Sequence, residues 1–449
     1  MSEQNLKPHL NLFDATVLVI GSVVGSGIFL TTGHIAGYLP SPGWILFVWL
    51  LGTILTLFGG LTFAELGAMI PEAGGQYAYL RESYGPFAGF MYGWTTFLVT
   101  HTGGIAALGV GFAEYLSYFL PGLGLDQYSL LGTILPISNG QIVALLSIAL
   151  LTAVNFYGIR SGNVVQNIFT VFKIIAIAIL VIAGLAFTAG TAESTSVQHT
   201  VPGGFGLISA VGISLIAVLW TFDGWYSVSC VASEIKNVKK NLPISLILGI
   251  SLTGLIYLAI NYYYVHSLPI PEMVGVERIG EKATSFMFGP DVGKIMSALI
   301  LVSIFGCLSA TVIFGPRIFY AMAEDRLFFR SFARVHPRHN SPHVAIIGQG
   351  IWSGLLCLTG TYEQLYTYVV FVLLLFYIAT AIGVFILRSK RPHAERPYKV
   401  WGYPFVPVLF ALAMFWIMMN TFFEKPVEAF FGIILVLTGV PIYVFWRKR

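Results

Sequence analysis

Residues 21–29 read Gly-Ser-Val-Val-Gly-Ser-Gly-Ile-Phe and lie in the middle of an apolar stretch over residues 13–37. An interior glycine costs a helix about 1 kcal/mol, so Gly25 and Gly27, on either side of Ser26, favour unwinding of the backbone. Unwound backbone within a membrane is tolerated only where protein buries it or where it lines a cavity. Its N–H groups and the start of the next helix can then bind an anion such as a carboxylate. The alternative is that these small residues let helices pack closely.

The composition is typical of a polytopic membrane protein. The chain has 449 residues, of which 56% are hydrophobic and only 10% charged, and its mean hydropathy is +0.81. Because a spanning helix needs about 20 mostly apolar residues, the sequence predicts an all-α membrane protein with twelve transmembrane helices. The predicted spans cover residues 13–37, 43–70, 86–119, 138–156, 163–188, 207–233, 243–266, 292–321, 343–359, 363–387, 404–424 and 427–446.

Lysines and arginines are distributed unevenly between the two sides of these spans. With the amino terminus inside, 19 of the 24 lie on the cytoplasmic side, as the positive-inside rule requires. The others are Arg278, Lys282, Lys294 and Lys425 on the opposite side and Lys173 within a span. We therefore expect a multi-pass protein of the cell membrane with both termini in the cytoplasm. The net charge of +4 reflects this topology, and we expect no nucleic-acid partner.

The sequence gives no sign of catalytic or metal chemistry. The three cysteines, Cys230, Cys307 and Cys357, lie in predicted spans, where packing is expected rather than disulfides or metal ligation. No spacing of histidines, cysteines and carboxylates suggests a metal, and no phosphate-binding loop suggests ATP. We therefore expect no cofactor and no catalytic residue. A membrane-embedded enzyme would need a paired acid and base within the spans, and none is evident.

A second interruption occurs in the sixth predicted span, where residues 221–225 read Thr-Phe-Asp-Gly-Trp. Interrupted spans at matching positions of two halves are typical of the binding site of a secondary transporter. A repeat of five spans must be inverted, because its second copy starts on the other side of the membrane. We expect one transporter domain over residues 1–449, with repeat one at about 13–188, repeat two at about 207–387 and two further helices over 404–446.

Further motifs accompany the first interruption along residues 10–400. They are Ala64-Glu65-Leu66-Gly67, Pro71-Glu72-Ala73-Gly74-Gly75-Gln76-Tyr77, the segment from Trp220 to Trp225, Ser233-Glu234-Ile235-Lys236-Asn237, and Asn155-Phe156-Tyr157-Gly158-Ile159-Arg160 with Gln166, Phe169 and Lys173. Together with residues 21–29 they resemble the amino acid–polyamine–organocation superfamily and, within it, the L-amino-acid transporter family. Animal members of that family are light chains of heteromeric exchangers.

The resemblance implies a LeuT-type fold, a 5+5 inverted repeat with helices 1 and 6 broken and an amino acid bound between them. The N–H groups of Ser26 and Gly27, with the Ser26 hydroxyl, would bind the α-carboxylate. Carbonyls near Val23 and those of Trp220 and Asp223 would bind the α-ammonium. Elementary electrostatics agrees, since opposed half-helix ends present a positive end to the carboxylate and a negative end to the amine.

Trp220 and Asp223 each have two interpretations. Trp220 would line the pocket as the aromatic gate of the family, or else fill the core. The Asp223 carboxylate would either recognise a cationic side chain or cap the unwound helix through backbone N–H groups. Relatives carry Asp or Gly at this position, which favours the cap.

Lys173 lies inside the fifth predicted span, between apolar residues. A lysine at the membrane centre costs at least about 2.5 kcal/mol on insertion scales, so it indicates a functional role with a partner. The alternative is that its side chain reaches the cytoplasmic interface. In the family, a lysine here bonds to helix 1 carbonyls where sodium-coupled relatives hold an ion, which implies sodium-independent transport. Tyr264 aligns with a helix 7 tyrosine whose hydroxyl would anchor this network.

The sequence departs from the animal light chains in one respect. Those chains carry a cysteine after the third span that links them to a heavy subunit, and residues 120–137 contain no cysteine. We therefore expect no disulfide-linked heavy subunit, and the expected partners are an amino acid and the lipid bilayer. The function expected is sodium-independent transport of L-amino acids, by exchange of neutral amino acids with alternating access. A proton-coupled or cationic amino acid transporter is the alternative and, in another class, an amino-acid sensor without transport.

Overall fold

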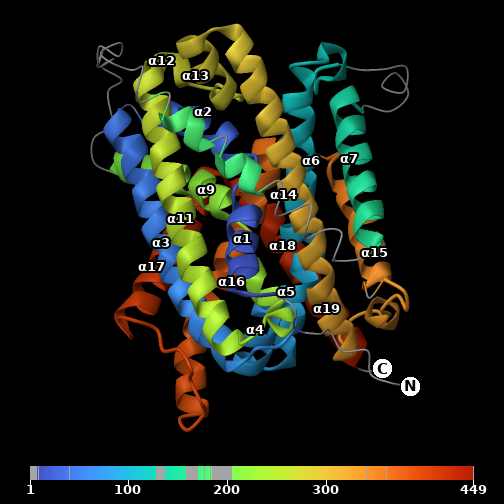
Figure 1. Cartoon of the computed structure of the whole chain (residues 1–449). Helices are drawn as coiled ribbons and strands as arrows, with labels where there is room; N and C mark the ends of the chain where they lie inside the picture. The colour runs from blue at the N-terminus through green and yellow to red at the C-terminus, as the bar shows by residue number, and fades with distance from the viewer. Residues whose placement is uncertain are drawn as a thin grey trace.

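Figure 1 shows the computed structural model of the chain. It describes residues 8, 10–39, 41–127, 137–157, 170–175, 177–182, 184, 205–339, 341–359 and 362–447. The described residues are helical throughout, apart from turns, connecting segments and an isolated bridge between Leu10 and Ile235. Residues 158–160, Gln166 and Phe169 of the sequence motifs lie outside the described residues, as do parts of the predicted fifth span.

The elements follow one another along the chain with short connections. They are α1 (Leu12–Val23), α2 (Gly27–Tyr38), α3 (Pro42–Met69), α4 (Gln76–Tyr84), α5 (Pro86–Thr95), the π-helical turn η1 (Thr96–Thr100), α6 (His101–Ser117), the 3-10 turn η2 (Pro121–Leu123), α7 (Asn139–Phe156), α9 (Phe205–Phe222), α10 (Ser227–Cys230), the 3-10 turn η4 (Ala232–Glu234), α11 (Val238–Ser267), α12 (Ile270–Met273), α13 (Ile279–Phe288), α14 (Pro290–Glu324), the 3-10 turn η5 (Arg330–Ala333), α15 (His343–Leu356), α16 (Tyr362–Lys390), α17 (Phe405–Glu424), α18 (Pro426–Leu437) and α19 (Gly439–Arg447).

The helices are long and apolar enough for a membrane. Within the described residues, eight are long enough to cross it, or nine if the bent pair α1 and α2 counts as one span. Three further predicted spans, 163–188, 207–233 and 343–359, correspond to shorter apolar helices over Thr170–Ile182, Gly206–Phe222 and His343–Leu356. The all-helical prediction is therefore confirmed. The count of twelve spans and their inverted repeat stay predictions.

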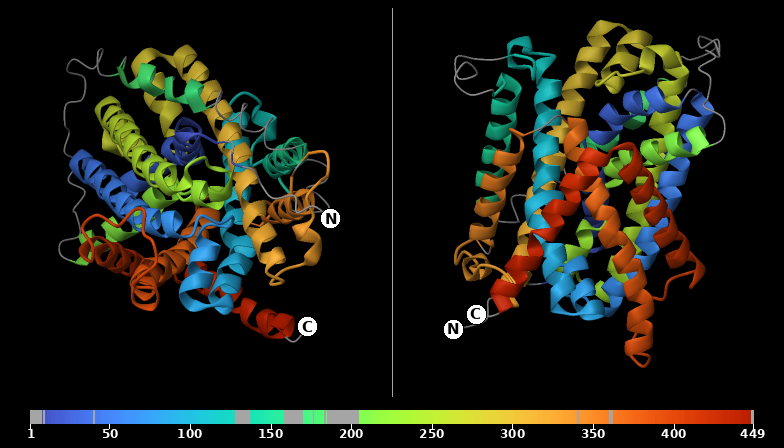
Figure 2. Two further views of the ribbon diagram at one scale, coloured as in Figure 1. Left: turned by 60° about the horizontal axis from the view of Figure 1, so that its bottom comes forward. Right: turned by 180° about the vertical axis from the view of Figure 1, so that it is seen from behind.

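The broken helices lie in the interior of the bundle. In Figures 1 and 2, α1 stands at the centre, with α3 and α11 on one side and α14 and α6 on the other. Every residue from 17 to 33 is buried, which is the pattern of a helix that is apolar on all faces and enclosed by protein. The two ends of the bundle are here called the α4 end and the α13 end, after the short helices that lie there (Figure 1).

The predicted interruption of the first span is confirmed. α1 ends at Val23, α2 begins at Gly27, and the two helices meet at an angle of 42°. α9 ends at Phe222, inside the second predicted interruption, and a turn leads to α10 at Ser227. Gly224 ends α9 with a φ of +94°, a left-handed conformation that costs glycine little and other residues more.

Candidate functional site

A cavity lies where the two helix breaks meet. It has a volume of about 40 Å³, room for about three water-sized groups. Five of the seven expected site residues line it: Val23, Ser26, Gly27, Trp220 and Asp223. The breaks face each other closely, because a side chain on Gly224 would lie 3.0 Å from the Ser22 carbonyl oxygen. Lys173 and Tyr264 do not line this cavity.

Lys173 lies next to the end of α1. The last four carbonyls of an α-helix have no partner within the helix, and in α1 these belong to residues 21–24. The Lys173 ammonium donates hydrogen bonds to the carbonyl oxygen of Gly21, at 3.0 Å, and to that of Val24. Its side chain is buried, so the alternative in which it reaches the membrane interface does not apply. Lys173 therefore neutralises the negative end of the α1 dipole.

The two carbonyls between them are bonded by other helices. The Cys307 thiol on α14 donates to the Ser22 carbonyl at 3.2 Å. The Tyr257 hydroxyl on α11 lies 2.8 Å from the Val23 carbonyl oxygen and 2.9 Å from that of Thr221 on α9. Its single proton can be donated to one of these two oxygens at a time. Tyr257 therefore links the backbone of the two breaks.

The structure corrects the contact expected of Tyr264. Its hydroxyl is buried and has no hydrogen-bond partner among the described residues. Tyr257, two helical turns earlier on α11, makes the contact with the end of α1 instead. Sequence alone could not choose between them, because α11 carries four tyrosines and the rotation of the helix decides which of them faces the break.

The start of α2 is bonded quite differently. Within the described part of the chain, no hydrogen bond reaches the backbone N–H groups of Ser26, Gly27 and Ile28, and no side chain caps the helix. The first N–H groups of a helix and its positive dipole end are suited to an anion. The Ser26 hydroxyl lies 3.0 Å from that of Tyr362, so it is already engaged on its other side.

Gly27 is also a packing residue. A Cβ at this position would lie 2.6 Å from the Thr221 hydroxyl oxygen and 2.9 Å from the Thr221 Cα on α9. Likewise, a Cβ on Gly25 would lie 2.6 Å from the Cys307 sulfur. The packing interpretation is therefore supported alongside the break, since the glycines at the break also let α1 and α2 approach α9 and α14 closely.

Trp220 forms the wall between this cavity and a larger one at the α13 end. Its indole N–H donates to the Tyr362 hydroxyl at 2.8 Å, and its ring stacks on Tyr366 with a centroid distance of 6.0 Å. Tyr362 lines the outer cavity, which has a volume of about 650 Å³ and also contains Glu114 and Arg278. Trp220, Tyr362 and Ser26 thus close the inner cavity on this side. Tyr362 was not among the site residues expected from the sequence.

The Asp223 carboxylate lies at the end of α9. The Tyr377 hydroxyl donates to it over 3.5 Å, a long and weak hydrogen bond, and the Gly224 backbone N–H lies close to it. These contacts fit the capping interpretation. The carboxylate also lines the cavity, so the geometry leaves it within reach of a bound molecule.

His101, at the start of α6, also lines the cavity. Its Nε2 lies 2.8 Å from the Thr311 carbonyl oxygen and 3.0 Å from the Gly315 backbone nitrogen on α14. This ring therefore contacts both the cavity and the spanning helix α14. His101 was not among the expected site residues, although a histidine inside an apolar span is a signal for a functional site.

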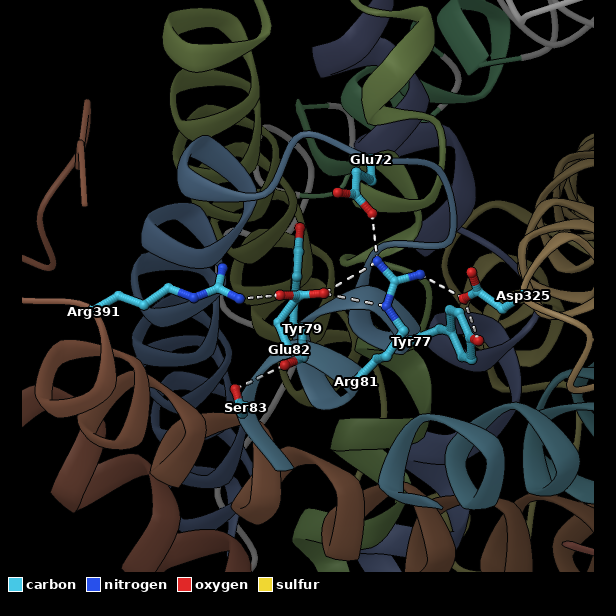
Figure 3. Close-up of polar contacts among 8 residues, drawn as sticks. All are labelled: Glu72, Tyr77, Tyr79, Arg81, Glu82, Ser83, Asp325 and Arg391. Carbon is cyan, nitrogen blue, oxygen red and sulfur yellow. Dashed lines mark hydrogen bonds and ion pairs between the residues drawn. The ribbon is translucent and has the colours of Figure 1, made fainter. Parts of the chain in front are cut away.

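Ion pairs close the opposite, α4 end. Figure 3 shows Arg81 among Glu72, Glu82 and Asp325, with the Tyr77 hydroxyl donating to Asp325 and Arg391 paired with Glu82. Although burial lowers the pKa of Arg81, its carboxylate partners raise it above the ordinary value, so Arg81 stays charged. This network joins α4 to α14 and α16 on the side opposite Trp220.

Comparison with known proteins identifies the family. The family model described as amino acid permease matches residues 10–444. The chain belongs to the amino acid permease family. It is 34% identical to the serine/threonine exchanger SteT of Bacillus subtilis, over 100% of this chain and 98% of that protein. It is 29% identical to the human Asc-type amino acid transporter 1, over 99% of this chain and 84% of the relative. The human b(0,+)-type amino acid transporter 1 is 28% identical, over 98% and 88%.

These matches confirm the family expected from the sequence motifs. As an amino acid permease, the protein is a multi-pass membrane transporter of amino acids and not an enzyme. The cavity between the broken helices is the candidate site for the amino acid. Among the described residues, no group of histidines, cysteines and carboxylates is arranged to hold a metal ion.

Proposed function

We propose that this permease is a sodium-independent exchanger of small neutral L-amino acids. The single observation that carries the proposal is the position of Lys173, whose ammonium bonds to the Gly21 and Val24 carbonyls. A fixed cation there supplies the positive charge that a sodium ion would otherwise bring to the end of α1. Unlike a sodium ion, the Lys173 ammonium does not bind and dissociate in each transport cycle. The site therefore offers no step by which a sodium gradient would drive accumulation.

The amino acid would lie between the two breaks. The N–H groups of Ser26 and Gly27 would bind its α-carboxylate, and the carbonyls of Val23, Trp220 and Asp223 its α-ammonium. The Val23 carbonyl already accepts from Tyr257, but a carbonyl has a second lone pair for another donor. These backbone groups recognise any L-amino acid, so specificity must come from the side chains that line the rest of the cavity.

The size of the cavity supports a small substrate. A volume of about 40 Å³ leaves room for little beyond a few atoms, and a long cationic side chain would require displacement of His101 or Trp220. The relative SteT is a serine/threonine exchanger by name, which agrees with small neutral substrates. Cationic substrates that use the Asp223 carboxylate are the second candidate, and they rest on its position in the cavity wall.

The residues that cover the cavity at its two ends support a mechanism of alternating access. Trp220 and Tyr362 would open towards the outer cavity, and the Arg81 network would open at the α4 end. We further propose the twelve-span LeuT-type 5+5 arrangement, with both termini and the α4 end in the cytoplasm, because 19 of 24 lysines and arginines fall on that side, as the positive-inside rule requires. The protein would act as a single chain at the cell membrane, without a disulfide-linked heavy subunit.

Uptake of labelled amino acids into vesicles containing the purified protein tests the proposal. We expect uptake of serine, threonine or alanine to require amino acid inside the vesicles and to be unchanged when choline replaces sodium. Dependence on external sodium would refute the role given to Lys173. Accumulation driven by a pH gradient without internal amino acid would replace exchange with proton symport. Binding without uptake under every condition would instead indicate a sensor.

A further inference from the structure

A groove unrelated to the amino acid site runs along one edge of the molecule. α7 and α15 lie side by side there, away from the broken helices, in both Figure 1 and the rear view of Figure 2. The groove between them has a volume of about 440 Å³, which is within the range of about 300–1,000 Å³ of ligand pockets. Among the described residues that line the groove, hydroxyl groups are carried by Thr152 and by Tyr157, which lies at the mouth; the other lining residues are apolar.

Small residues create the groove. Ala149, Ala153 and Gly350 line it together with Ile347 and Ile351. A Cβ on Gly350 would lie 2.4 Å from the Thr152 hydroxyl oxygen, so α7 and α15 touch closely through this glycine. The groove opens outward, since Ile351 is 64% exposed. Its shape and apolar lining fit an extended hydrocarbon chain.

The mouth of the groove is aromatic and basic. Phe156 and Tyr157, at the end of α7, belong to its lining. Histidine rings from the segment before α15 pack on them, with centroid distances of 5.5 Å for Phe156 with His336 and 5.4 Å for Tyr157 with His339. Aromatic and histidine side chains with one apolar and one polar side are suited to the membrane–water boundary.

Arg334 supplies positive charge at this mouth. It lies two residues before His336, whose ring packs on Phe156, and His343 also packs on Phe156 at 5.8 Å. Arg334 and Arg338 are exposed, and among the described residues neither forms an ion pair with a carboxylate. Unpaired guanidinium groups beside an apolar groove match a phosphate attached to acyl chains.

We propose that the α7–α15 groove binds one anionic phospholipid. An acyl chain lies along Ala149, Ala153 and Ile351, and the phosphate contacts Arg334 at the α4 end. A transmembrane helix of another protein would fill the apolar groove equally well, but it would leave the basic mouth without a counter-charge. The lipid satisfies both features with one molecule.

Native mass spectrometry of the purified full-length protein tests the proposal. The protein is equilibrated in detergent with an equimolar mixture of phosphatidylglycerol and phosphatidylcholine, and the retained lipid molecules are counted. We expect one retained phosphatidylglycerol, with a preference of about fivefold over phosphatidylcholine from one arginine at the membrane surface. Arg334→Gln should abolish that preference but keep one lipid bound. Arg330→Gln, on the same segment, is the charge-matched control and should behave as the wild type.

A second pair of variants tests the groove itself. Ala153→Phe fills it from an exposed position and should abolish retention of either lipid. Val154→Phe, the neighbouring exposed residue outside the lining, should have no effect. Unchanged retention in Ala153→Phe would overturn the proposal, as would equal effects of Arg334→Gln and Arg330→Gln. Disulfide-linked dimers formed by Ala153→Cys in native membranes would assign the groove to a second copy of the chain instead.

Discussion

The two sides of the first break are bonded in opposite ways. Before the break, the carbonyls of residues 21–24 accept hydrogen bonds from side chains of three other helices. After it, the N–H groups of Ser26, Gly27 and Ile28 have no partner among the described residues. The carbonyl side is thus held by the protein's own donors, whereas the N–H side, on the proposed function, would donate to a carboxylate.

This difference indicates which backbone groups of the break are satisfied by the protein itself and which would be satisfied by a bound amino acid. The carbonyl end already accepts hydrogen bonds from Lys173, Tyr257 and Cys307 without an amino acid. On the proposed function, the N–H side would gain hydrogen bonds to a charged group when a carboxylate binds, and such bonds are worth about 1.5–3 kcal/mol each. Affinity should therefore depend more on the carboxylate than on the amine.

The largest effect is expected for Gly27→Ala. Its Cβ would lie 2.9 Å from the Thr221 Cα, so α2 would have to move away from α9 and the N–H groups with it. We expect uptake to fall at least about 100-fold, equivalent to about 2.7 kcal/mol. Gly37→Ala is the matched control on the same helix, because the nearest atom to its Cβ would be 3.8 Å away. Equal uptake by both variants would show that the start of α2 does not form the site.

Changing the substrate probes the N–H side without altering the protein. An amino acid amide keeps the ammonium but replaces the carboxylate with a neutral acceptor that also carries N–H donors. We expect amides to compete with labelled serine about 10- to 100-fold less well than the free acids, since bonds to a charged group are lost. Strong competition by the amides would place recognition on the carbonyl side.

Lys173→Met probes the carbonyl side. It leaves two buried carbonyls without their donor, at a cost of about 1–3 kcal/mol for each unsatisfied group. We expect a lower unfolding temperature in detergent and slower exchange. Replacement by Arg should restore part of both, because it returns a donor and a positive charge. Unchanged stability in Lys173→Met would mean that the α1 end does not depend on this ammonium.

Smaller effects are expected for the neutral donors. Tyr257→Phe removes one hydroxyl from between the two breaks, which is worth about 1 kcal/mol. Cys307→Ala removes a weaker S–H donor and should cost less, because the Ser22 carbonyl loses only a weak hydrogen bond. Thermal unfolding of both variants, beside Lys173→Met, ranks the three donors. An equal decrease in unfolding temperature for Cys307→Ala and Tyr257→Phe would contradict this order.

Sequence patterns predicted the backbone features of this site better than its side-chain contacts. Glycines at 25, 27 and 224 marked the breaks, because glycine lowers the cost of leaving the helix at any depth. Lys173 was evident as a charge in an apolar span. Both signals are local, so they can be read along a single chain.

Contacts between distant helices could not be predicted in the same way. Tyr257 and Tyr264 both lie on α11, and which of them meets α1 depends on the rotation of that helix in the bundle. Tyr362 and His101 lie on spans whose relative heights the sequence does not give. The packing of whole helices decides these contacts, and hydrophobic periodicity is weak where helices are apolar on all faces.

The π-helical turn at Thr96–Thr100, just before His101, has a consequence for the length of the third span. Such a turn holds one residue more than an α-helical turn, and the Thr102 hydroxyl bonds back to the Phe97 carbonyl at 2.7 Å. Deleting one residue here would restore a regular helix while His101 kept its direction. Deleting one residue between His101 and Ser117 would instead rotate the two parts of α6 by about 100° relative to each other. The third span can therefore shorten during evolution at this turn and still present His101 to the cavity.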